Sequence, residues 1–173
     1  MQDGIKPVAQ KLIHVFRAVL ADDVPELRED TRIVLVAVMR AVGIESTFAA
    51  LKDDFANHDI SIRRHTAKMV AIMALAFGPE ISFQIIGDVA RSEVEAARYT
   101  AARSLSESAI LLAHGITKHL DLVQPVLERL IVDSRSRVKV EAASALSHVA
   151  DACAPYGIAY FAPLMGHVRD ECR

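Results

Sequence analysis

Basic side chains recur near the starts of successive apolar segments, and the chemistry that they could perform is the binding of phosphate groups. The five that we assign to a candidate phosphate-binding site are Arg63, Arg64, Lys68, Arg103 and Arg137, and Arg135 lies near the same register. In a stack of similar helical units these side chains would line up along one edge. Free backbone N–H groups at helix N-termini attract anions at the same place. The sequence therefore predicts a phosphate-binding edge.

Acidic neighbours give this edge a second interpretation. The carboxylates closest to it in the sequence are Asp59, Glu93, Glu95 and Asp133. They weaken the positive field, so a solvated charged rim without a ligand explains the residues as well as a phosphate site does.

A related set of bases has an internal explanation. Arg28, Arg63, Arg98 and Lys139 share one register, and six positions before them stand Asp22, Asn57, Ser92 and Asp133. These polar residues can cap helices, and their side chains can also hydrogen-bond to the base of their own repeat or of the next one. For Arg28, Arg98 and Lys139 we expect such a ladder, which would satisfy the bases internally.

The sequence contains no catalytic motif that we recognise. It has no nucleophile-elbow pattern, no phosphate loop and no zinc-like spacing of Cys and His. The seven histidines are spread over different predicted helices, and an enzyme that stacks damaged DNA bases is a poor fit because the chain has no Trp. We predict a protein that is not an enzyme and that uses no cofactor or metal.

The elements that carry these bases form a repeat. Leu35, Val70, Leu105 and Leu146 each stand seven positions after one of the four registered bases, and we expect them in the core. The predicted helix stops are Gly43, Gly78, Gly115 and Gly157. A unit of about 35 to 42 residues read four times indicates an all-α HEAT-repeat solenoid. We expect one array over 1–173, with repeats at about 5–43, 44–78, 79–115 and 116–157 and a terminal half repeat at 158–173.

Apolar periodicity and capping residues place the individual helices. The predicted helices are 5–20, 25–42, 45–56, 60–77, a helix from Pro79, a helix capped by Ser92 that runs to about His114, 117–132, a helix capped by Asp133 or Ser134 that ends near Cys153, and a last helix from about Pro163. Ser92 and Glu95 have the spacing of a capping box, and Pro125 should kink the helix that contains it.

Composition limits the class of protein. The hydrophobic fraction is 52% with only 5% aromatic residues, which suits closely packed helices, and the net charge of −2 gives no general support for nucleic-acid binding. The two cysteines are too few for a disulfide framework, and we find neither a signal peptide nor a membrane span. We expect a soluble intracellular protein or a piece of one. The unpaired last helix indicates a fragment of a longer repeat array, and a partner or homodimer that covers this end is the alternative.

Several stretches, in order, resemble one known family. TRIVLVAVMRAVGI, DISIRRHTAKMVAIMALAFG, ARYTAARSLSESAILLAHGITKHL and VDSRSRVKVEAASALSHVADACAPYGIAYF are similar to the HEAT-repeat region of splicing factor 3b subunit 1. The last stretch, with PYGI, is the most specific. The resemblance covers about residues 27–168 and only several units of a longer family array.

The resemblance implies a right-handed superhelix that clasps pre-mRNA near the branch site and polypyrimidine tract, in the nucleus. It implies other splicing factor 3b subunits, spliceosomal proteins and the pre-mRNA backbone as partners, with no enzyme activity, membrane or small-molecule substrate. It places Arg63, Tyr99, Arg103 and Arg137 on an inner edge that borders the intron and the splicing helicase. Tyr99 departs from the histidine often found there, and the branch adenosine pocket belongs to later repeats.

A second function class remains open from the sequence. HEAT scaffolds of transport or phosphatase assemblies hold a partner helix in their groove, and the same bases would then meet acidic side chains of a protein partner. Binding of splicing subunits without added RNA would favour the splicing hypothesis over this alternative.

Overall fold

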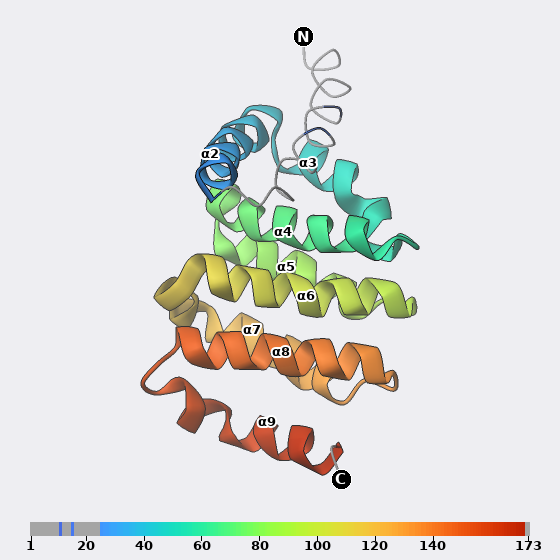
Figure 1. Cartoon of the computed structure of the whole chain (residues 1–173), viewed down its shortest axis with the longest axis vertical. Coiled ribbons are helices and arrows are strands. Elements are labelled where there is room, and N and C mark those ends of the chain that lie inside the picture. Colours follow the sequence, from blue (N-terminus) through green and yellow to red (C-terminus); the bar gives the residue numbers. More distant parts are fainter. Residues whose placement is uncertain (1–10, 12–14, 16–24, 172–173) are drawn as a thin grey trace.

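A computed structural model describes residues 11, 15 and 25–171 of the chain. Over these residues the fold is all-α, a HEAT-like solenoid of paired helices stacked along the long axis (Figure 1). The helices in chain order are α2 (Pro25–Val42), α3 (Ile44–Leu51), α4 (Ile60–Phe77), α5 (Pro79–Val89), α6 (Glu95–Leu112), α7 (Leu120–Ile131), α8 (Ser136–Ala152) and α9 (Gly157–Glu171). Short 3-10 segments at Lys52–Ala56 and Ala113–His119 extend two of the connections.

Three long helices form the layer that carries the predicted site. α6 packs between α4 and α8, and α5 and α7 pack behind these three as a second layer (Figure 1). The three helices run in the same direction, so their N-terminal ends lie at one edge of the stack. This arrangement brings first-turn residues of different repeats together.

The sequence of α4 explains its bounds. Asp59 Oδ1 accepts a hydrogen bond of 2.7 Å from the backbone N–H of Ser61, which caps the first turn. The helix ends before Gly78, whose φ of 103° and ψ of 146° lie in a region open only to glycine. Gly43 plays the same part after α2 with φ 83°. Both glycines stop helices, as the sequence predicted.

The predicted core register is confirmed. Leu35, Val70 and Leu105 are fully buried and Leu146 is nearly so, and all four belong to one apolar cluster. Their common burial agrees with the register that placed all four on the core side of their helices. The Leu35 helix is further joined to α4 by Arg40, which donates to the carbonyls of Leu75 and Ala76.

Two residues that we predicted to cap helices accept hydrogen bonds in the turn before the helix instead. Ser92 Oγ accepts from the Val94 N–H at 3.2 Å, and Asp133 Oδ1 accepts from the Arg135 N–H at 2.9 Å. Neither side chain bonds to the helix itself, since α6 begins after Val94 and α8 after Arg135. The capping box of Ser92 and Glu95 and the direct cap by Asp133 or Ser134 were therefore wrong. Both side chains instead shape the turn before the helix.

Two predicted glycine stops were also wrong. α6 ends at Leu112, and the positive φ there, 45°, falls on Ala113 and not on Gly115. Gly157 begins α9 instead of ending α8, so the last helix starts earlier than Pro163, which lies inside it. A Cβ on Gly157 would approach the Ala150 carbonyl oxygen to 2.0 Å, so close packing explains this glycine. The predicted helix 5–20, Asp22 and the side chain of Arg28 lie outside the described residues.

No single helix in the described part of the chain is long and apolar enough to cross a membrane. The segments Glu29–Val42 and Ile44–Ala56 meet that test only as a pair, bent by 114°.

Candidate nucleic-acid interface

A groove of about 870 Å³ crosses the N-terminal ends of α4, α6 and α8. Arg63 of α4, Tyr99 of α6 and Arg137 of α8 line it together, although they are far apart in the sequence. Two of the five predicted site residues, Arg63 and Arg137, therefore meet in one groove. The tertiary stacking brings them together, as expected for equivalent edges of successive repeats.

The Arg63 guanidinium is engaged mainly by contacts within the chain. Its Nη1 donates to the carbonyls of Asn57 at 2.6 Å and His58 at 3.1 Å. Its guanidinium carbon lies 5.4 Å from the centroid of the Tyr99 ring, within reach of a cation–π interaction. Its buried Nε has no hydrogen-bond partner among the described residues. Arg63 thus shapes the wall of the groove and offers little free charge.

Arg103 is bound by two carboxylates. Its Nε donates to Glu107 Oε1 at 3.0 Å and its Nη1 to Glu141 Oε1 at 3.2 Å. Burial alone would lower the pKa of Arg103, but Glu107 and Glu141 outweigh burial and raise it. Burial first and the Glu141 carboxylate second also raise the pKa of Tyr99. The Arg103 guanidinium, which we predicted to contact phosphate, is therefore already bound by two carboxylates of the chain.

The remaining predicted bases differ in exposure. Arg64 and Arg137 are exposed, whereas Lys68 is half-buried and has a partner within the structure. The Arg137 side chain makes no hydrogen bond or ion pair with any residue that the structure describes. Arg64 and Arg137 are thus the two predicted bases with the most accessible charge.

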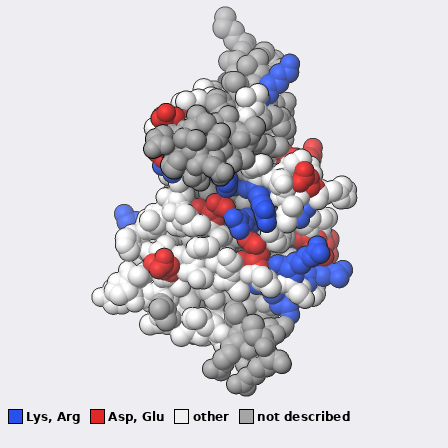
Figure 2. Space-filling view, viewed as in Figure 1, with Lys and Arg blue, Asp and Glu red and all other residues white. Residues whose placement is uncertain are grey.

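Equivalent positions on the three helices do not all carry a base. In the register that aligns Arg63, Arg98 and Lys139, Arg64 corresponds to Tyr99 and to Val140. Val140 is 70% exposed, so an apolar side chain stands on α8 where α4 has an arginine. Of the three aligned residues, the one on α4 therefore carries the positive charge. On α8 the positive charge lies at Arg137, in the first turn. Figure 2 shows Lys and Arg gathered on this face with Asp and Glu among them.

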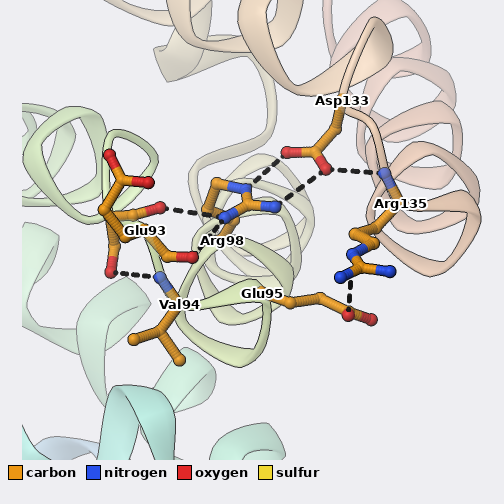
Figure 3. A network of polar contacts seen from close by, with 7 residues as sticks. Glu93, Val94, Glu95, Arg98, Asp133 and Arg135 are labelled. Atoms are coloured by element: carbon orange, nitrogen blue, oxygen red, sulfur yellow. Dashed lines mark hydrogen bonds and ion pairs between the residues drawn. The ribbon is translucent and has the colours of Figure 1, made fainter.

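One rung of the expected ladder, at Arg98, forms between α6 and the turn before α8. Arg98 Nε bonds Asp133 Oδ2 at 2.6 Å and Arg98 Nη2 bonds Asp133 Oδ1 at 3.1 Å, while Nη1 donates to the carbonyls of Ser92 and Glu93 (Figure 3). The side chains of Arg98 and Asp133 are only 15% and 7% exposed. Burial raises the pKa of Asp133, but the hydrogen bonds from Arg98 and Arg135 outweigh it and lower that pKa.

The ladder differs from the prediction in two details. The residue six positions before Arg63 or Arg98 contributes its backbone carbonyl, from Asn57 or Ser92, and not its side chain. The Asp133 carboxylate binds the base of the preceding repeat, not that of the next one. The hydrogen bonds that Arg98 donates to Asp133 raise the pKa of Arg98, so this base stays in its charged form.

A second cavity, of about 880 Å³, is lined in part by this ion pair. Arg91, Arg129, Arg135 and Ser134 line it together with acidic side chains. Two of its arginines already have exposed acidic partners, since Arg91 pairs with Asp88 at 2.8 Å and Arg135 Nε lies 3.5 Å from Glu95 Oε2. The cavity is mixed in charge.

The sequence interpretation missed the carboxylates that neutralise Arg103. Glu107 lies four positions after Arg103 on the same helix, a spacing that could have indicated the pair. Glu141 lies at the same spacing after Arg137, so local rules would have paired those two instead. Only the stacking of α6 on α8 directs Glu141 to Arg103. No cluster of His, Cys, Asp and Glu suited to a metal ion occurs in the described part of the chain.

Comparison with known proteins finds relatives but no matching family model. The chain is 27% identical over 162 residues to the U2 snRNP component prp10 of Schizosaccharomyces pombe, covering 93% of this chain and 13% of the relative. It is 26% identical over 160 residues to the U2 snRNP component HSH155 of Saccharomyces cerevisiae, covering 92% and 16%. The chain therefore spans less than a fifth of either relative's length.

Among solved structures, an engineered protein matches 95% of this chain with 17% sequence identity and a TM-score of 0.48. The two yeast relatives are counterparts of splicing factor 3b subunit 1. The resemblance of this chain to that family is therefore confirmed over nearly its whole length.

Proposed function

We propose that this chain is a non-catalytic HEAT-repeat scaffold of a pre-mRNA splicing factor that helps to hold pre-mRNA near the branch site and polypyrimidine tract. The similarity to two U2 snRNP components supports the splicing role. The nucleus as its location, and other splicing factor 3b subunits and spliceosomal proteins as its partners, belong to the same proposal. The helical repeat provides the surfaces on which such partners could assemble.

The observation that carries the RNA part is the groove shared by Arg63 and Arg137. Among the five predicted residues, we assign the phosphate contacts mainly to Arg137, which lines the groove, and to the exposed Arg64, which follows Arg63 in α4 outside the groove lining. Lys68 and Arg103 would contribute less because their partners within the protein compete with a phosphate. A few phosphate contacts predict weak, sequence-tolerant and salt-dependent binding.

A fluorescence anisotropy titration of the chain with pyrimidine-rich single-stranded RNA tests this proposal. We expect affinity to fall by about tenfold between roughly 50 and 200 mM salt if two or three phosphates are contacted. Arg137→Glu should weaken binding clearly. Lys118→Glu is the matched control, because it makes the same charge change at an exposed position beyond the C-terminal end of α6. Salt-independent binding, or equal losses in both variants, would contradict the proposed edge.

A second candidate is a protein-binding HEAT scaffold of the kind found in transport or phosphatase assemblies. The apolar residues that line the groove favour it, since Ile60, Val94 and Val140 are all at least 42% exposed. Pull-down from RNase-treated nuclear extract separates the candidates. Recovery of splicing subunits supports the splicing scaffold, whereas recovery only of transport or phosphatase subunits supports the second candidate.

A further inference from the structure

Two serines alternate with arginines where the connection from α7 meets α8, in Ser134-Arg135-Ser136-Arg137, and Ser136 is the first residue of α8. All four residues are exposed, and the backbone at Arg135 is extended, with φ −105° and ψ 123°. Exposed connections of this kind are the sites at which modifying enzymes gain access to a chain. The segment therefore presents a serine hydroxyl between two positive charges to solvent.

The Ser136 hydroxyl differs from those of Ser92, Ser104 and Ser106, which are hydrogen-bonded within the protein. Ser104 and Ser106 are buried and hydrogen-bonded, and Ser92 Oγ accepts from a backbone N–H. The Ser136 hydroxyl has no hydrogen bond to any residue that the structure describes. Ser136 also lines the groove that contains Arg63 and Arg137, whereas Ser134 lines the second cavity beside Asp133.

We propose that Ser136 is a phosphorylation site for a protein kinase that recognises serines flanked by arginines, and that its phosphate closes the groove to RNA. In the reaction the Ser136 Oγ forms a bond to the γ-phosphorus of a nucleoside triphosphate. The bond between that phosphorus and the β–γ bridging oxygen breaks, the nucleoside diphosphate leaves with the electron pair, and the hydroxyl proton passes to the base of the kinase.

The charges that line the groove explain the expected effect. Arg63 and Arg137 are balanced there by Glu95 and Glu141. A phosphoserine adds a charge of about −1.5 to −2 and three acceptor oxygens. The groove would then carry net negative charge, and Arg137 would be occupied by the phosphate of its own chain. The effect on RNA rests on the proposed function, but the modification itself does not.

The first experiment measures the modification alone. The chain is incubated with an arginine–serine-directed kinase and MgATP, and the product is mapped by tandem mass spectrometry. We expect phosphate on Ser136, and a Ser136→Ala variant should lose that phosphate. Phosphate found only on Ser134, or on neither serine, would overturn the assignment.

The second experiment measures contact between the phosphate and the groove. Phosphoserine is incorporated genetically at position 136, and its second ionisation is followed by ³¹P NMR against pH. A nearby cation favours the dianion, so Arg137→Gln should shift the titration of phosphoserine to higher pH. Phosphoserine at Ser147, an exposed position later in α8, is the matched control and should not respond to Arg137→Gln. Equal behaviour at the two positions would exclude a phosphate held in the groove.

The third experiment measures RNA. Phosphoserine at 136 should weaken RNA binding by roughly tenfold and reduce its salt dependence, while phosphoserine at 147 should change it little. Thermal unfolding should show that both modified chains stay folded. If the unmodified chain binds no RNA, the proposed function fails, and the mass and NMR results still decide the modification. If it binds RNA and phosphoserine at 136 has no effect, the regulatory inference is wrong.

Discussion

Arg98 and Asp133 form a two-pronged ion pair across successive repeats, with contacts of 2.6 and 3.1 Å and little exposure of either side chain. Arg98 also donates to two carbonyls of the turn before its own helix. One guanidinium therefore ties together α6, the turn before it and the turn before α8 (Figure 3).

Removing one partner of this pair should destabilise the fold strongly, because the other would be left buried and charged. We expect Asp133→Ala to lower the free energy of unfolding by about 3 kcal/mol, the lower end for buried pairs. Asp88→Ala breaks the exposed pair with Arg91 and serves as the control, with an expected loss under about 0.5 kcal/mol. Urea unfolding measures the free energy of unfolding of both variants. Similar losses would show that the ion pair of Arg98 and Asp133 stabilises the fold no more than an exposed pair does.

The same pair predicts a dependence of stability on pH. The folded chain holds the pKa of Asp133 below its usual value, so the unfolded chain binds the proton more readily. The stabilisation is then complete above the unfolded pKa of about 4, and it is lost as pH falls through the lower folded pKa. Asp133→Asn should be less stable near pH 7 and should differ less from the wild-type chain as the solution becomes acidic. Urea midpoints measured across this range would contradict the assignment if the difference stayed constant.

The buried leucines of α6 and α8 should be costly to truncate. Leu105→Ala and Leu146→Ala each leave a cavity in the core, and we expect losses of about 2 to 5 kcal/mol. Ile110→Ala is the control on α6, because Ile110 is 58% exposed and should cost under about 0.5 kcal/mol. Losses below that limit at both leucines would mean that the repeat register is wrong.

The carboxylates that hold Arg103 should limit its use as a phosphate contact. Glu141→Gln removes one negative charge while keeping a hydrogen-bond acceptor near Arg103 and Tyr99. We therefore expect RNA affinity to rise, by roughly threefold at low salt, and to become more salt-dependent. Glu128→Gln is the comparison, since Glu128 lines the second cavity instead of the groove. Unchanged affinity in Glu141→Gln would show that Arg103 does not take part.

Local sequence determined the positions of most helices and the core. The apolar spacing of α4, the glycines at 43 and 78 and the burial of Leu105 follow from helical periodicity and glycine geometry, which are properties of short segments. The same local rules misplaced the start of α9. At Gly157 the deciding contact comes from Ala150 in the preceding helix, which the spacing within one helix does not reveal.

Only the tertiary structure decided which charges are available. Glu141 lies four positions after Arg137, a spacing at which side chains on one helix can pair, yet it binds Arg103 of the neighbouring helix. Asp133 likewise binds Arg98, which belongs to the preceding repeat. Such pairs depend on the offset between packed helices, which is set by side-chain packing across the whole layer. The sequence by itself fixed where the bases lie along each helix. The stacking of α4, α6 and α8 then left Arg64 and Arg137 exposed and held Arg98 and Arg103 in ion pairs.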